Sequence, residues 1–91
     1  MQRAEFLAAI RQLAAAAEIL AKAGPSDGRL DAFQLLAFFR RYDNPALDSA
    51  TTTTSDDRLF ALTAQAALDL AGRNAFEASH ALLEQARSLL S

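Results

Sequence analysis

The chain has 91 residues and a formal net charge of −2, with nine basic and eleven acidic residues spread along it. A chain of this length forms one domain, residues 1–91, and the absence of a basic face argues against nucleic acid as a partner. The 22 alanines and 15 leucines, with no valine, favour helices over strands. We therefore expect an all-α protein.

Other classes are excluded by what the sequence lacks. It has no cysteine, which removes disulfides, thiol catalysis and cysteine-ligated zinc. No run of apolar residues is long enough to span a membrane. Arg11, Gln12 and Glu18 interrupt the N-terminal apolar stretch that a signal peptide would need, so we expect a cytoplasmic protein. Eight arginines against one lysine, with so much alanine, suggest a bacterial origin.

The first two helices are expected over about residues 2–23 and 27–42. Gly24-Pro25 separates them, since glycine accepts a left-handed conformation and proline cannot continue a helix. Ser26 or Asp27 would cap the second helix. Apolar residues at spacings of 4, 3, 4 and 3 form the buried stripe of the first: Phe6, Ile10, Leu13, Ala17 and Leu20. The polar segment 43–54, with four consecutive threonines, is expected to be a flexible linker.

The third and fourth helices are expected over about residues 56–71 and 75–90. Ser55 would cap the third, and Asn74 with Glu77 has the spacing of a capping box at the start of the fourth. The inner face of the third is expected to carry Leu59, Leu62, Thr63, Ala66 and Leu70. That of the fourth is expected to carry Phe76, Ser79, Leu83, Ala86 and Leu90.

Two antiparallel hairpins result, and a small four-helix bundle is the expected architecture. The segment Gly72–Ala78, with Leu82, Leu83 and Ala86 after it, resembles the turn and second helix of a tetratricopeptide-type repeat. Its glycine-to-Glu-Ala interval is one residue longer than the pattern of that family. The resemblance covers the last two helices only and implies a peptide-binding helical scaffold, which is the alternative architecture.

Two candidate sites of other kinds are weak. The turn Asp27–Asp31 is similar to the middle of an EF-hand calcium loop, but it lacks the first acidic ligand and the final bidentate glutamate. It remains an alternative small-ligand site. His80 is the only histidine and has Glu84 one turn further on. We expect neither a metal site nor a cofactor, and no nucleophile–base pair that would make the chain an enzyme.

The second helix carries the strongest functional signal. Its run of leucines and aromatic residues covers nearly every side, and such a helix must be covered on more than one side. Aromatic residues and arginine are enriched where partners bind. We expect a protein–protein interaction module (an adaptor, chaperone or regulator) with an apolar groove formed by Phe33, Leu36, Phe38, Phe39, Arg40 and Tyr42. The alternatives are a homodimer that buries the same surface and a second helix at the centre of the bundle.

Overall fold

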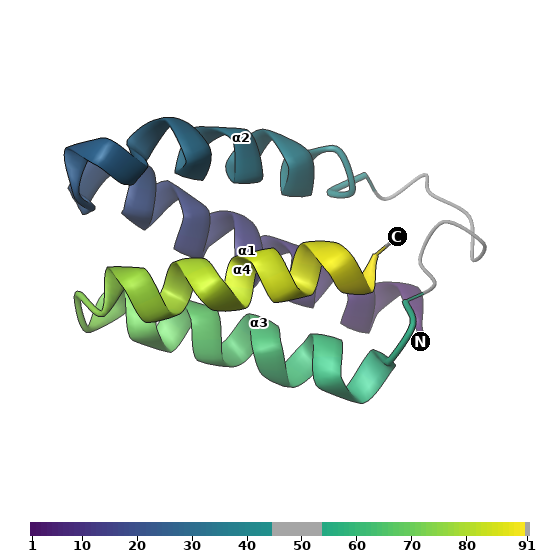
Figure 1. Ribbon diagram of the computed structural model, residues 1–91. Helices are drawn as coiled ribbons and strands as arrows, with labels where there is room; N and C mark the ends of the chain where they lie inside the picture. The colour runs from purple at the N-terminus through teal and green to yellow at the C-terminus, as the bar shows by residue number, and fades with distance from the viewer. Residues whose placement is uncertain (45–53, 91) are drawn as a thin grey trace.

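The computed structural model describes residues 1–44 and 54–90 (Figure 1). The described residues form four α-helices and one short 3-10 helix, and they contain no strand. The helices are α1 (Arg3–Ala23), α2 (Arg29–Arg40), α3 (Asp57–Gly72) and α4 (Phe76–Leu89), with η1 (Ser26–Gly28) before α2. The all-α prediction is confirmed. Most of the expected flexible linker falls on residues 45–53, which lie outside the described part of the chain.

The helices pack as a small bundle in which α1 is the central member. It contacts α2, α3 and α4, and α3 and α4 form a second closely packed hairpin. Figure 1 shows α2 and α3 on different sides of α1, with α4 running beside α3. Contacts between α2 and α4 are sparse. The alternative with the second helix at the centre is therefore wrong, because α1 occupies that position.

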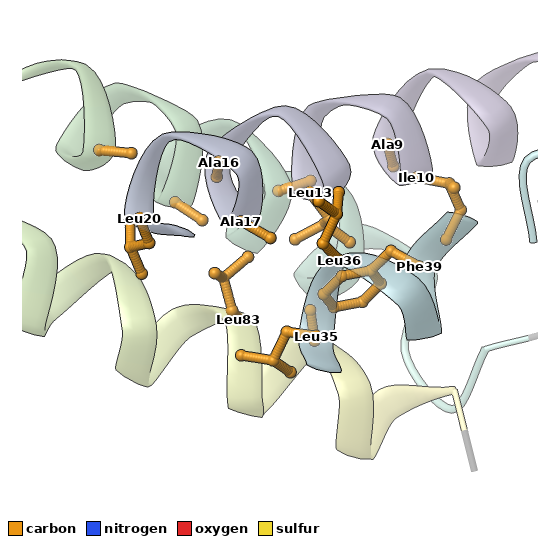
Figure 2. Packing of buried hydrophobic residues seen from close by; sticks show 14 of the residues in the cluster. Ala9, Ile10, Leu13, Ala16, Ala17, Leu20, Leu35, Leu36, Phe39 and Leu83 are labelled. Carbon is orange, nitrogen blue, oxygen red and sulfur yellow. The ribbon is translucent and has the colours of Figure 1, made fainter. Parts of the chain in front are cut away.

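The buried stripe of α1 is the one that the spacing predicts. Phe6, Ile10, Leu13, Ala17 and Leu20 are all buried. Figure 2 shows Leu13 and Ile10 of α1 next to Leu36 and Phe39 of α2, and Leu35 of α2 near Leu83 of α4. Alanines between the large residues let the helix axes approach closely, so that a thin core is well filled.

The predicted inner face of α3 is wrong for most of its residues. Phe60, Thr63, Ala64, Ala67 and Ala71 are the buried ones, whereas Leu59, Leu62 and Ala66 are exposed. The rings of Phe60 and Phe6 stack with their centroids 5.8 Å apart and an interplanar angle of 15°. Because Phe60 is buried in this contact, α3 turns Ala64 and Ala67 toward the core and Leu59 and Leu62 toward solvent.

The turns also differ from the prediction in detail. Gly24 is extended, with φ −76° and ψ 176°, and a Cβ atom there would lie 2.5 Å from the carbonyl oxygen of Leu20. Glycine is therefore needed for close approach and not for a left-handed turn. The left-handed residue is Asn74, with φ 65°, and it does not cap α4 through its side chain. Asp56, not Ser55, caps α3 by accepting a hydrogen bond from the Leu59 amide at 3.0 Å.

Candidate functional site

The six predicted partner-binding residues, five on α2 and Tyr42 just after it, do not share one surface. Leu36 and Phe39 are buried, with 6% and 0% of their surfaces exposed, because the side of α2 that carries them faces α1. Phe38 and Tyr42 are half-buried, and Phe33 and Arg40 are exposed. Leu36 and Phe39 are therefore core residues and do not line the groove expected from the sequence. Phe33 is the one apolar member that is largely open to solvent.

An aromatic cluster explains most of the run that marks α2 in the sequence. The ring of Phe38 lies 5.4 Å from that of Phe39 and 5.5 Å from that of Tyr42. Tyr42 in turn meets Phe6 of α1 edge-on at 6.1 Å. The guanidinium of Arg41 lies over the Phe38 ring at 5.5 Å, a cation–π contact at the edge of the cluster. These rings hold α2 onto α1, so their abundance reflects packing.

Large hydrophobic side chains are nevertheless exposed on two helices of the described chain. On α2 they are Leu30 at 72% and Phe33 at 52% exposure, one turn apart. On α3 they are Leu59 at 40% and Leu62 at 51%. Because α2 and α3 pack on different sides of α1, these pairs belong to separate surfaces.

The longer of the two surfaces follows the outer side of α3. Leu59, Leu62, Ala66 and Leu70 have spacings of 3, 4 and 4, which place them on one side of a helix. The first three are exposed and Leu70 is half-buried. We call these four residues the α3 leucine face. The sequence pattern identifies the stripe, but the expectation that it lies inside the bundle is wrong.

The two flanks of the α3 leucine face differ. At 100° per residue, the exposed residues Arg58, Gln65 and Asp69 all lie on one flank. Helix α4 covers the other flank, where Gln85 donates a hydrogen bond to the Thr63 hydroxyl at 3.1 Å. The α3 leucine face is thus bordered by polar and charged side chains on one flank and by α4 on the other.

A cleft of about 470 Å³ opens between the α1–α2 turn and the start of α4. Acidic residues, the single histidine and a few apolar residues line it: Leu20, Pro25, Asp27, Gly28, Asp31, Phe76, Glu77 and His80. Both acids of the Asp27–Asp31 turn therefore line the same hollow. No EF-hand loop forms there, since the turn consists of η1 and the first residues of α2.

Two residues that line the cleft, Asp31 and His80, belong to a cluster of three titratable side chains that is completed by Glu84. His80 contacts the carboxylate of Asp31 through Nε2, and the same atom lies 3.9 Å from Oε1 of Glu84. One donor atom from each of the three residues lies within 4.8 Å of the other two. The pairing of His80 with Glu84 follows from their spacing on α4. Asp31 is 49 residues away from His80, and nothing in the local pattern pairs the two.

The hydroxyl nearest to His80 in the sequence has a different role. Ser79 is fully buried and donates a hydrogen bond to the Ala67 carbonyl oxygen at 2.7 Å, on the α3 side of α4. His80 reaches toward α2 instead. The neighbouring serine therefore does not act as a nucleophile activated by this histidine.

Comparison with known proteins does not assign the chain to a family. No family model, curated protein or solved structure matches it. Among the described residues, no helix has both the length and the apolar character needed to cross a bilayer. Any functional conclusion therefore rests on the exposed apolar surfaces and on the cluster of Asp31, His80 and Glu84.

Proposed function

We propose that this chain is a small helical protein–protein interaction module that binds a second copy of itself through the α3 leucine face. The observation that carries the proposal is the exposure of Leu59 and Leu62 on a helix whose opposite side is core. Removing apolar surface from water is worth about 25 cal/mol per Å², so a stripe of leucines favours association. Contiguous apolar patches of this kind typically mark interaction surfaces.

The charges beside the stripe support a second copy as the occupant. A two-fold axis between two antiparallel α3 helices brings identical flanks together. If that axis passes between Leu62 and Ala66, Arg58 of one copy lies beside Asp69 of the other, and the reciprocal pair forms as well. A parallel two-fold arrangement would instead place the charged flank of one copy against the flank of the other copy that α4 covers. The flank is thus complementary to itself in the antiparallel orientation only.

The expected association is weak. A 16-residue helix is about 24 Å long, so contact along α3 covers less than the roughly 800 Å² per partner of a standard interface. Asp69 also forms an ion pair at 3.1 Å with Arg73, the residue that follows its own helix, and this pair competes with the intermolecular one. We therefore expect a dimer with a dissociation constant on the order of micromolar or weaker, typical of small interfaces.

Sedimentation equilibrium over a wide concentration range tests this proposal. The wild type should pass from monomer to dimer, and the double variant Leu59→Gln, Leu62→Gln should remain monomeric with its helical content unchanged. The matched control is Leu30→Gln, Phe33→Gln, which removes the exposed apolar pair of α2 and should dimerise like the wild type. A wild type that stays monomeric to millimolar concentration would refute the proposal.

The second candidate is a partner helix bound on the outer side of α2, as an adaptor, chaperone or regulator would require. It is favoured by Leu30, the most exposed large hydrophobic residue among the described ones, and by Phe33 beside it. Loss of self-association in the α2 variant alone would assign the contact to Leu30 and Phe33 and contradict the role of α3.

A further inference from the structure

We propose that Asp31, His80 and Glu84 form a binding site for a divalent transition-metal ion of the zinc class. The three side chains come from two helices that otherwise touch little, and their donor atoms lie within 4.8 Å of one another. The side chains are 34–44% exposed, so an ion can reach them from solvent. The site lies between α2 and α4, and it is independent of the α3 leucine face.

The donor set selects the class of ion. An imidazole nitrogen with carboxylate oxygens suits zinc and its neighbours in the first transition row, whereas calcium and magnesium prefer oxygen ligands alone. Ligand atoms around a tetrahedral zinc ion lie about 3.4 Å apart, because each bond is about 2.1 Å long. The 3.9 Å between His80 Nε2 and Glu84 Oε1 needs only a small side-chain adjustment to reach that separation.

Arg87 orients the Glu84 carboxylate for metal binding. Its guanidinium lies 2.7 Å from Oε2 of Glu84, while Oε1 is the oxygen that faces His80. Glu84 can therefore bind an ion through Oε1 and keep its ion pair through Oε2. Such outer contacts orient metal ligands and are part of the design of metal sites.

The cleft supplies the remaining features of a site. Three protein ligands leave one tetrahedral position open, and Asp31 and His80 line the cleft, from which water or a small anionic ligand can complete the coordination. Asp27 and Glu77 line the same cleft and add negative charge that attracts a cation. A bound ion would link α2 to α4 and thereby raise the melting temperature by mass action.

Isothermal titration with zinc chloride, combined with thermal unfolding of the same samples, tests the site. The wild type should bind one zinc ion per chain and melt at a higher temperature with zinc present. His80→Gln and Asp31→Asn should each bind at least tenfold more weakly. Magnesium and calcium should give no comparable binding. The control Asp43→Asn removes a carboxylate that pairs with Arg11, away from the cluster, and should bind zinc like the wild type.

Several outcomes would overturn the proposal. One is the absence of zinc binding up to millimolar concentration in the wild type. Another is equal binding by His80→Gln and the wild type, which would assign the ion to scattered surface carboxylates. A stoichiometry of one ion per two chains would place the ion between copies and contradict a site within one chain. Circular dichroism of each variant checks that the fold is intact.

Discussion

The hydroxyl of Ser79 on α4 donates a hydrogen bond to the carbonyl oxygen of Ala67 on α3, 2.7 Å away and fully buried. A serine at this position lets the two helices approach closely and satisfies its own polar group at the contact. A second polar contact, between Gln85 and Thr63, joins the same two helices further along. The α3–α4 hairpin is thus held by specific polar contacts as well as by apolar packing.

Ser79→Ala is expected to lower the free energy of unfolding by about 1 kcal/mol, the net value of one buried hydrogen bond. The alanine fits the space, so no clash adds to the loss. Urea denaturation measures the change. Arg58→Ala, an exposed substitution on α3, serves as the control and should stay within about 0.5 kcal/mol of the wild type. Equal stability of Ser79→Ala and the wild type would show that this contact contributes nothing.

Phe39→Ala should destabilise the protein by about 3–5 kcal/mol, because it leaves a cavity where α1 meets α2. That is a large part of the stability of a small domain, which is about 5–15 kcal/mol. Phe33→Ala, six residues earlier on the same helix, should change stability by less than about 0.5 kcal/mol, since Phe33 is 52% exposed. Thermal unfolding of the two variants compares them directly. Similar melting temperatures would mean that Phe39 does not lie in the core.

Asp56→Ala should cost about 1 kcal/mol, because it removes the side chain that caps the first turn of α3. Ser55→Ala should cost less, because the Ser55 hydroxyl makes only a long contact, at 3.4 Å, with the carbonyl of Leu89. Chemical denaturation of both variants decides which residue is the cap. A greater loss in Ser55→Ala would restore the assignment expected from sequence.

Two carboxylates are expected to make stability depend on acid pH. The hydrogen bond from Lys22, and then the charges of Lys22 and Arg40, lower the pKa of Glu18 from its ordinary value of 4.5. The hydrogen bond from the Met1 amino group, and then that from Thr54, lower the pKa of Asp57 from 3.8. Because both values are lower in the folded state, their contribution is present above the ordinary values and is lost as pH falls through the lowered ones.

The double variant Glu18→Gln, Asp57→Asn should therefore lose less stability than the wild type as pH falls from 6 to about 2. Denaturant titrations at several pH values measure the two slopes. The same Asp57 raises the pKa of the Met1 amino group from 8.0, and that contribution is lost as pH rises through the raised value. Identical acid slopes in the two proteins would show that neither pair stabilises the fold.

The helices were predictable from sequence where residue type alone determines whether the chain is helical. Alanine and leucine, with Gly24-Pro25 and Gly72 between them, indicate where helices begin and end, and the observed helix ends lie within two residues of the predicted ones. The stripe of α1 was predictable because most of its large residues, though not Ile19, occupy one side. On α3, however, leucines and alanines compete for the core, and a distant contact between Phe60 and Phe6 decides between them.

The surfaces were less predictable, because contacts with distant residues again decide which apolar side chains are buried. A helix that is apolar on nearly every side, as α2 is, gives only a weak periodic signal for which residues face its neighbour, so buried Phe39 could not be separated from exposed Phe33. The cluster of Asp31, His80 and Glu84 depends on the fold, which brings Asp31 next to His80. Only the proximity of His80 and Glu84, one turn apart on α4, follows from spacing along the chain.

Cross-linking of single-cysteine variants tests the antiparallel α3 dimer most directly, since the native chain has no cysteine. With the two-fold axis between Leu62 and Ala66, equivalent atoms at position 66 lie about 6 Å apart along the helices and those at position 58 about 18 Å apart. A bis-maleimide whose reach lies between these separations should link Ala66→Cys into a covalent dimer and leave Arg58→Cys unlinked, with sedimentation of each unlinked variant showing that it still dimerises. Equal linking of both variants, or of neither, would contradict the account.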